Sequence, residues 1–287
     1  MTSHVNSSSV LAELATKSSV EEFVGLIRQV SMRLVTEDGR VGSLKVTGRL
    51  VEAPPAGEAI VVGDLHGDLK SLMYILEESN FLAKVKKAKD VLLIFLGDYG
   101  DRGVHSPEVY YVVLKLKEMF PERIILMRGN HEGPPDLLAS PHDLPILLEN
   151  KFGKKGSEVY SELRELFNHL YTAVIIKDSI VLLHGGAPSQ ATTIDDIAYV
   201  HKNHPQKRHL EEILWNDPYA NLKGTVASPR GAGRLFGSDV TRKFLRMLNV
   251  KALIRSHQSC HDGYRSIHQG SVSVSYTHLT LPTTPYV

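Results

Sequence analysis

Short apolar runs that alternate with amphipathic stretches constrain the fold of this 287-residue chain most strongly. The runs at residues 59–62, 91–96 and 124–127 have the length and composition of buried strands. The stretches between them, residues 69–79 and 106–120, have helical periodicity. Strands joined by helices predict right-handed crossovers and a parallel sheet that is covered on both faces. We therefore expect an α/β fold.

Each predicted strand ends in a cluster of polar residues, and two later apolar runs, at residues 180–183 and 252–254, follow the same plan. Open α/β sheets place their functional sites beyond the carboxyl ends of the strands, so these polar residues should meet. The set offers enough side chains for two adjacent metal ions, with one histidine left over. Its members are Asp64, His66, Asp98, Asn130, His131, His184 and His257.

The residue types in this set suit divalent metals. Asp64 and His66 are two residues apart at a strand end, where both side chains would point to one face and reach one ion. The two carboxylate oxygens of Asp98 allow it to bridge two cations. Neutral oxygen and nitrogen ligands for the second cation come from Asn130, His184 and His257. Mixed oxygen and nitrogen ligation without a thiolate favours manganese, iron or zinc over calcium.

A pair of divalent cations indicates phosphoryl chemistry, because two ions ~3.5–4 Å apart can activate a water and stabilise charge at phosphorus. Arg102 and Arg230 carry guanidinium groups that can bind phosphate through two hydrogen bonds. His131 follows a predicted ligand directly and is a candidate general acid. Asp101 is a candidate to orient the His131 imidazole.

Other conspicuous residues have simpler interpretations. We expect His201, His204 and His209 to lie in a solvated loop, and we expect the same of His142. His169 and His268 are interpreted in the same way. Trp215 is expected to serve packing, with a place in the lining of the cleft as the alternative.

Composition excludes several classes of protein. The chain has 33 Lys and Arg against 32 Asp and Glu, so no basic excess indicates nucleic acid or an anionic membrane as partner. Cys260 is the single cysteine, so no disulfide can form within the chain. No apolar run approaches the ~18 residues of a membrane span, and the N-terminus lacks the features of a secretory signal. We therefore expect a cytoplasmic protein.

The polar clusters resemble the signature of the phosphoprotein phosphatases, the serine/threonine phosphatases of the calcineurin-like metallophosphoesterases. Its three parts stand here as Gly63-Asp64-Leu65-His66-Gly67, then residues 97–103 (GDYGDRG), then residues 128–132 (RGNHE). Later marks of the family are residues 184–186 (HGG), 214–218 (LWNDP), 230–231 with 236–237, and 255–258 (RSHQ) with 262–264. The resemblance covers about residues 59–270, and the insert at residues 133–145 is similar to archaeal members.

This resemblance implies a metallophosphoesterase sandwich of two mixed β-sheets flanked by helices. It implies that Asp64, His66 and Asp98 hold one metal, and that Asp98, Asn130, His184 and His257 hold the other. It also implies two divalent ions (manganese, with iron or zinc as alternatives) and hydrolysis by direct attack of water. The phosphate would be bound by Arg102, Asn130, His131 and Arg230, and His131 backed by Asp101 would be the acid. The implied partners are a phosphoprotein substrate and an unidentified regulatory subunit.

Three segments are expected along the chain. Residues 1–54 form an N-terminal extension with one helix, which begins after Ser19, and a short strand region at residues 43–51. Residues 55–272 form the catalytic domain. Residues 273–287 do not match the family pattern, and residues 274–283 resemble the translation of a sequencing adapter. We expect a non-native tail there, with the final strands of the fold truncated.

Two alternatives to a protein phosphatase remain open from the sequence. A dinucleoside tetraphosphatase, or another phosphoesterase of the same fold, would use the same ligands; the elements around Trp215 and Arg230 favour the protein phosphatase. An interaction module that kept the fold without the activity is the alternative from a different class. All the predicted ligands are present, which argues against that loss of activity.

Overall fold

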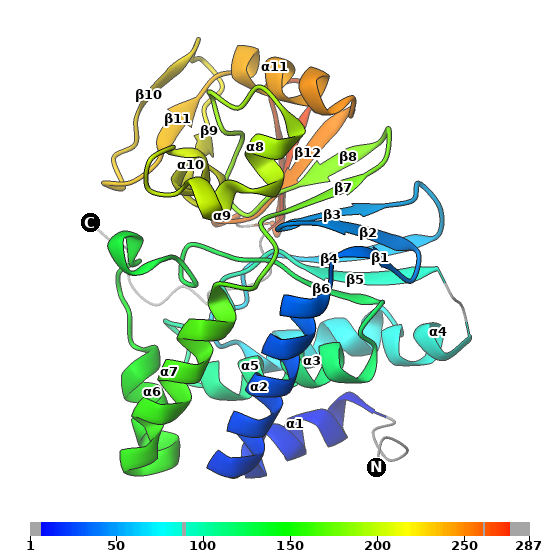
Figure 1. Cartoon of the computed structure of the whole chain (residues 1–287), viewed down its shortest axis with the longest axis vertical. Coiled ribbons are helices and arrows are strands. Elements are labelled where there is room, and N and C mark those ends of the chain that lie inside the picture. The colour runs from blue at the N-terminus through cyan, green and yellow to red at the C-terminus, as the bar shows by residue number, and fades with distance from the viewer. Residues whose placement is uncertain (1–6, 88–89, 261, 276–287) are drawn as a thin grey trace.

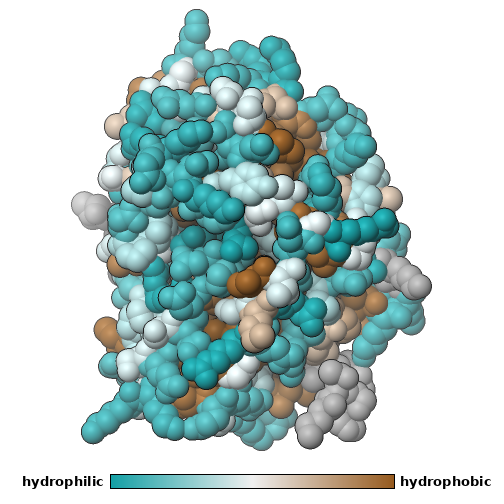
Figure 2. All heavy atoms as spheres, in the orientation of Figure 1, coloured by the Kyte–Doolittle hydropathy of each residue, from teal (hydrophilic) through white to brown (hydrophobic). Residues whose placement is uncertain are grey.

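The computed structural model describes residues 7–87, 90–260 and 262–275. Strands occupy the middle of the molecule, between a layer formed by α1–α7 and a second group formed by α8–α11 with a small sheet (Figure 1). The fold is a mixed α/β sandwich, as predicted. The face shown in Figure 2 is mostly hydrophilic, with apolar residues in separate small patches.

The three apolar runs form a parallel sheet, which confirms the predicted strand–helix–strand pattern. Val62 pairs with Phe95, which pairs with Leu126, so the three strands end side by side. The strands in sheet order are β4 (Glu58–Val62), β5 (Val91–Phe95) and β6 (Ile124–Leu126), and the helices between them are α3 (Leu69–Glu78), α4 (Phe81–Lys87) and α5 (Ser106–Met119).

An eight-stranded mixed sheet forms the second sheet of the sandwich, in the order β1-β2-β3-β7-β8-β12-β14-β13. β7 and β8 pair antiparallel and form a hairpin. β12 lies parallel to both of its neighbours, β8 and β14. The strands are β1 (Gly39–Val41), β2 (Leu44–Thr47), β3 (Leu50–Ala53), β7 (Ala173–Ile176), β8 (Ile180–Leu182), β12 (Ala252–Arg255), β13 (Tyr264–Ile267) and β14 (Val272–Ser275).

The N-terminal residues are built into this sandwich. In α2 (Val20–Thr36), the Ser19 side chain accepts the N–H of Glu22 and caps the helix, as its spacing predicted. The buried face of α2, which includes Phe23 and Ile27, packs against α5 and α7. β3 pairs in parallel with β7. Residues 7–53 therefore share the core and the large sheet with the rest of the fold.

The remaining elements cover the two sides of the sandwich. Residues 134–170 contain α6 and α7, and residues 238–248 form α11. These elements are α1 (Ser8–Lys17), η1 (Pro135–Leu137), α6 (Leu144–Phe152), η2 (Gly153–Lys155), α7 (Gly156–Phe167), α8 (Ile194–Ala198), α9 (Val200–Asn203), α10 (His209–Trp215), β9 (Asp217–Pro218), β10 (Thr225–Ala227), β11 (Arg234–Phe236) and α11 (Ser238–Leu248). Among the described residues, no helix combines the length and apolarity that a membrane span requires.

The large sheet continues past β12 by two strands. β14 lies between β12 and β13, with Val272 and Val274 fully buried, so β13 is the edge strand. Residues 273–275, which the sequence assigned to a tail, therefore form part of an interior strand. The rest of that segment, residues 276–287, lies outside the described residues.

Candidate metal centre and active site

The loops that follow five strands meet at one edge of the sandwich. Asp64 and His66 follow β4, Asp98 follows β5, and Asn130 follows β6. His184 and His257 come from the large sheet, after β8 and β12. The structure thus brings together all six side chains that the sequence selected as metal ligands, and each of them is buried.

The reason expected for the pairing of Asp64 with His66 is wrong, although the two side chains do meet. β4 ends at Val62, so the alternation of side chains along a strand does not apply to them. Instead the backbone turns through the left-handed region at His66, with φ of 43°. This turn brings His66 Nε2 to 3.7 Å from Asp64 Oδ2. Asp98 and His257 also have positive φ, of 55° and 68°, so left-handed residues, rare outside glycine, recur among the candidate ligands.

Asp98 stands at the centre of the cluster. Its Oδ2 atom lies 3.6 Å from His66 Nε2 and 3.4 Å from His184 Nε2. Asn130 Oδ1 lies 2.9 Å from His184 Nε2 and 2.7 Å from His257 Nδ1. Asp98 is therefore the side chain that connects the Asp64 and His66 pair to the group around Asn130.

Two of the imidazoles are oriented for metal binding by backbone carbonyls. His66 Nδ1 lies 3.0 Å from the oxygen of Gly100, and His184 Nδ1 lies 3.0 Å from the oxygen of Leu96. A carbonyl only accepts, so each Nδ1 carries the hydrogen, and in the neutral ring Nε2 presents a lone pair. Both lone pairs face oxygen atoms of the cluster. An arrangement in which nitrogen and oxygen lone pairs converge fits a cation, and such carbonyl partners are typical of metal-binding histidines.

The charges of the cluster shift the pKa values of its members. Burial would lower the pKa of His184, but the Asp98 carboxylate beside it raises that pKa above its usual value. Burial dominates at His66 and lowers its pKa to about 4. Burial, followed by the positive charges around it, holds the pKa of His257 well below its usual range. These shifts favour neutral His66 and His257, which is the form that binds metal.

Asp64 is held by the segment that carries His257. The hydroxyl of Ser256 donates to Asp64 Oδ1, and the N–H of His257 donates to the same oxygen at 3.1 Å. Only Asp64 Oδ2 thus remains turned toward His66. The sequence patterns assign Ser256 no role of its own, and its position directly before His257 is the one signal that could have indicated it.

Glu132 ties together the loops that carry Asp98 and Asn130, a role that the sequence did not assign. Its carboxylate is fully buried and accepts the backbone N–H groups of Asp98, Tyr99 and Gly129 at 2.8, 3.0 and 3.0 Å. The hydroxyl of Tyr110 donates to it at 2.6 Å. Glu132 therefore fixes the geometry of the candidate ligands without joining them.

His131, Asp101 and Arg102 form a second group beside the cluster. His131 Nδ1 donates to Asp101 Oδ2 at 2.6 Å, and Arg102 Nη2 lies 3.3 Å from His131 Nε2. Burial would lower the pKa of His131, but the carboxylates of Asp98 and Asp101 raise it. Burial would raise the pKa of Asp101, but hydrogen bonds from His131 and His142 lower it. A histidine held between carboxylates is suited to carry a proton.

His142 contradicts the expectation of a solvated loop. Its side chain is 17% exposed, and its Nδ1 donates to Asp101 Oδ2 at 3.1 Å. The partner lies 41 residues away along the chain, so no local pattern in the sequence indicates this contact.

Arg230 lies between β10 and β11, and its positive charge adds to burial in lowering the pKa of His257. Its Nε donates to Asp217 Oδ2 at 2.7 Å, and the buried Arg255 donates through Nη2 to Asp217 Oδ1 at 2.9 Å. The Arg230 side chain is 36% exposed, which leaves part of its guanidinium available to a ligand. Trp215 is buried, and its ring packs edge-on against His257 at 5.6 Å between centroids. It therefore packs directly against a candidate ligand.

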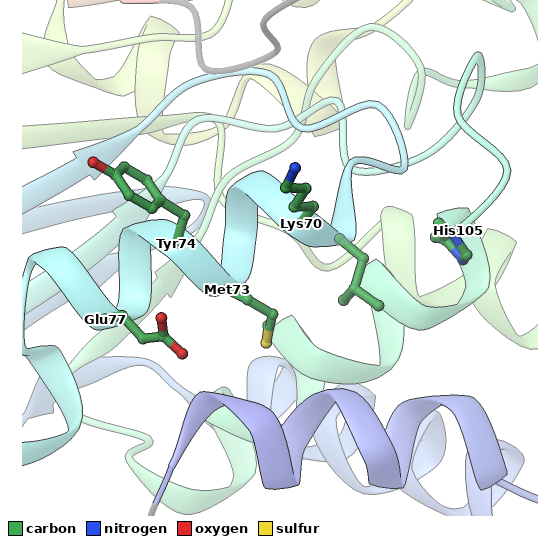
Figure 3. Close-up of a pocket in the computed structure, with 6 residues that line it drawn as sticks. Lys70, Met73, Tyr74, Glu77 and His105 are labelled. Carbon is green, nitrogen blue, oxygen red and sulfur yellow. The ribbon is translucent and has the colours of Figure 1, made fainter.

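A surface pocket on α3 is distinct from this site. Figure 3 shows its lining residues along α3 together with His105, which precedes α5. The residues that line it are Leu69, Lys70, Met73, Tyr74, Glu77 and His105. It contains none of the predicted site residues.

Known proteins are similar to this chain in sequence. Residues 59–260 match the family described as calcineurin-like phosphoesterase. The chain is 35% identical over 219 residues to a protein phosphatase 2A catalytic subunit of Dictyostelium discoideum, a match that covers 76% of this chain and 67% of the relative. It is 33% identical over 230 residues to the PP2A-like phosphatase PPG1 of Saccharomyces cerevisiae, covering 76% of this chain and 60% of that relative.

Solved structures show the same fold. A protein serine/threonine phosphatase from Saccharomyces cerevisiae with similarity to human phosphatase PP5 has a TM-score of 0.72 at 23% identity, covering 90% of this chain and 76% of that chain. A cold-active protein-tyrosine phosphatase from a psychrophilic Shewanella species has a TM-score of 0.51 at 15% identity, covering 80% of this chain and 73% of that chain. The fold alone thus does not fix which phosphorylated residue is recognised. The matched segment and the relatives together show that the chain belongs to the calcineurin-like phosphoesterase family, within its group of serine/threonine protein phosphatases.

Proposed function

We propose that this protein is a metal-dependent phosphatase that hydrolyses phosphate monoesters on serine and threonine residues of proteins. The observation that carries the proposal is the convergence of six candidate metal ligands beside the His131–Asp101 pair. Its membership of the serine/threonine phosphatase group supports the choice of substrate.

The candidate ligands divide into two groups that share Asp98. Asp64, His66 and Asp98 would hold one cation, and Asp98, Asn130, His184 and His257 would hold the other. Two divalent cations bound there would supply Lewis acidity toward a water molecule and toward the phosphoryl group. We propose manganese as an effective metal in vitro, with iron or zinc as alternatives, because the ligands are oxygen and nitrogen without thiolate.

The other residues bind phosphate and deliver the proton. Arg102 and Arg230 would bind phosphoryl oxygens through their guanidinium groups. His131 would give a proton from Nε2 to the serine or threonine oxygen as that oxygen leaves phosphorus. Asp101, hydrogen-bonded to Nδ1, would keep Nε2 directed at the leaving oxygen and would stabilise the protonated ring.

Turnover of three substrates with added Mn²⁺ tests this proposal. We expect hydrolysis of a phosphoserine peptide and of p-nitrophenyl phosphate, and loss of both activities when EDTA is added. Hydrolysis of a dinucleoside tetraphosphate alone would contradict the choice of substrate. An absence of Mn²⁺-dependent turnover on all three would contradict the assignment as an enzyme.

Further properties follow as proposals from the family and the composition. We propose a cytoplasmic location, a regulatory subunit as partner, and no direct binding to nucleic acid or membrane. The span of residues 55–272 for the catalytic part stays a prediction, and β14 continues past its second bound to Ser275. The relationship of residues 133–145 to archaeal members remains a prediction.

A further inference from the structure

The Asp101 carboxylate is surrounded by four hydrogen-bond donors. Oδ2 accepts from His131 Nδ1 at 2.6 Å and from His142 Nδ1 at 3.1 Å. Oδ1 accepts the backbone N–H groups of Asp143 and Leu144 at 3.0 and 2.8 Å, at the start of α6. Asp143 in turn accepts the N–H of Arg102 at 3.0 Å through its own carboxylate. One segment, residues 142–144, thus fixes both oxygens of the carboxylate that orients His131.

The tautomer of the neutral His142 ring follows from its contact with Asp101. An ionised carboxylate only accepts, so His142 Nδ1 carries a hydrogen and donates it to Asp101. In the neutral ring His142 Nε2 is then an acceptor, and the hydroxyl of Tyr160 on α7 lies 2.7 Å from it. The Tyr160 ring also contacts the imidazole, with 5.6 Å between centroids. In this tautomer the Tyr160 hydroxyl donates to Nε2 and so helps to hold the His142 ring toward Asp101.

We propose that His142 is a positioning residue for the general acid, which acts on His131 through Asp101 and is itself oriented by Tyr160. The proposal rests on the proposed phosphatase function. Without His142, Oδ2 keeps one donor, and the carboxylate can turn about the two backbone N–H groups that hold Oδ1. The imidazole of His131 would follow, so that Nε2 would point less well at the leaving oxygen.

A loss of general-acid catalysis lowers kcat more for a substrate with a poor leaving group than for one with a good leaving group, whereas a general loss of structure lowers both. The alkoxide of a phosphoserine is a poor leaving group and needs a proton as it departs, whereas p-nitrophenolate is a good one that needs little protonation. We expect His142→Ala to lower kcat for the phosphoserine peptide ~10-fold and kcat for p-nitrophenyl phosphate less than ~3-fold, because positioning is part of a general-acid effect of ~10²–10⁴. KM should stay within about twofold for both substrates, since His142 does not touch the phosphate.

Two further variants distinguish a positioning role of His142 from a role in the stability of the fold. In His142→Asn the side-chain amide can replace the Nδ1 donor, so most of the activity on phosphoserine should return. Tyr160→Phe keeps the ring and removes the hydroxyl. Its kcat should also fall more for the phosphoserine peptide than for p-nitrophenyl phosphate, and the fall should be smaller than in His142→Ala. His204→Ala is the matched control. The His204 side chain is also mostly buried (12% exposed), and its Nε2 lies 2.9 Å from a carboxylate, but that carboxylate belongs to Asp136 and not to Asp101.

The experiment measures kcat and KM for both substrates with saturating Mn²⁺, together with the melting temperature of each variant. A selective loss on the peptide in His142→Ala, its recovery in His142→Asn and unchanged kinetics in His204→Ala would support the proposal. An equal loss on both substrates, no loss at all, or no recovery with Asn would overturn it. An absence of turnover in the unmodified protein would instead contradict the phosphatase function, and with it this role of His142.

Discussion

His131 Nδ1 lies 2.6 Å from Asp101 Oδ2, and both side chains are buried. An asparagine at position 101 would remove the negative charge that stabilises the protonated ring. It would keep the local backbone, because asparagine tolerates the positive φ of 62° found there. We expect Asp101→Asn to lower kcat for a phosphoserine peptide by ~10²-fold or more, with metal content unchanged. Steady-state kinetics and metal analysis of the same sample check this prediction; loss of metal would show that Asp101 supports the metal centre instead.

Removal of the proposed acid should separate turnover from metal binding. His131 follows Asn130 in sequence, but its side chain pairs with Asp101 and Arg102. We expect His131→Ala to lower turnover by ~10²–10⁴-fold while the metal content stays near that of the unmodified protein. Atomic emission analysis of the purified variant gives the metal content. A variant that no longer holds metal would mean that His131 is a ligand, and the acid would have to be sought elsewhere.

The stability of the metal-free protein should fall as the pH is lowered through the range of His66. The pKa of His66 is about 4 in the folded protein, against an unfolded value of ~6.5. Because the folded pKa is the lower one, this contribution is fully present above pH ~6.5 and is lost as the pH falls toward ~4. The shift corresponds to about 3 kcal/mol of unfolding free energy.

Urea unfolding in EDTA, at about pH 7.5 and about pH 4, tests this prediction against His66→Asn, which suits the positive φ at that residue. His131 and His184, whose pKa values are raised, respond in the opposite sense and remain in both proteins. An equal loss of stability in the two proteins would contradict a role for His66.

Glu132 should be needed in its carboxylate form. The replacement Glu132→Gln turns one acceptor oxygen into an NH₂ donor, which would face buried backbone N–H groups or the Tyr110 hydroxyl. Leaving buried donors without acceptors costs ~1–3 kcal/mol each, so the variant should melt at a clearly lower temperature. Tyr110→Phe removes a single hydrogen bond to the same carboxylate and should cost only ~1 kcal/mol. Equal stability of the two variants would mean that the backbone hydrogen bonds of Glu132 contribute no more to stability than its hydrogen bond with Tyr110.

The loop that carries Asn130 needs glycine at position 129 for space. A Cβ atom there would overlap the backbone N–H and the carboxylate of Asp98. We expect Gly129→Ala to displace Asp98 and to weaken Mn²⁺ binding by ~10-fold or more, a displacement cost of at least ~1.4 kcal/mol. Gly25→Ala is the matched control, because a Cβ in that position of α2 meets no atom within 4 Å. The control should bind metal normally and should gain up to ~1 kcal/mol of stability from helix propensity. Calorimetric titration with Mn²⁺ would decide, and equal affinity of the two variants would contradict the prediction.

The parts of the fold that depend on local pattern could be predicted from the sequence. The apolar runs of β4, β5 and β6 and the amphipathic stretches of α3 and α5 specify their own conformations. Because the strand ends meet at one edge, the proximity of Asp98 and His184 could be predicted without knowledge of their individual contacts.

The contacts that refine the site could not be predicted in this way. Ser256 holds Asp64 across 192 residues, and His142 reaches Asp101 across 41, so no spacing in the chain reveals either contact. The left-handed turn at His66 is also set by surrounding packing, since histidine adopts that conformation only rarely. For the same reason the parallel pairing of β3 with β7, which draws the N-terminal residues into the sheet, escaped a local interpretation.

Because β12 lies between β8 and β14, the candidate metal site can be completed only late in the synthesis of the chain. β12 leads to His257 and is held between β8 and β14, so its place in the sheet is complete only when residues near 275 have left the ribosome. A nascent chain that has emerged only to β8 and the loop after it already carries Asp64, Asp98 and His184, but it lacks His257 and the Ser256 hydroxyl that steadies Asp64. Because metal binding is coupled to folding, such a chain should bind metal weakly. The protein would thus acquire phosphatase activity only after β14 has been made and has paired with β12.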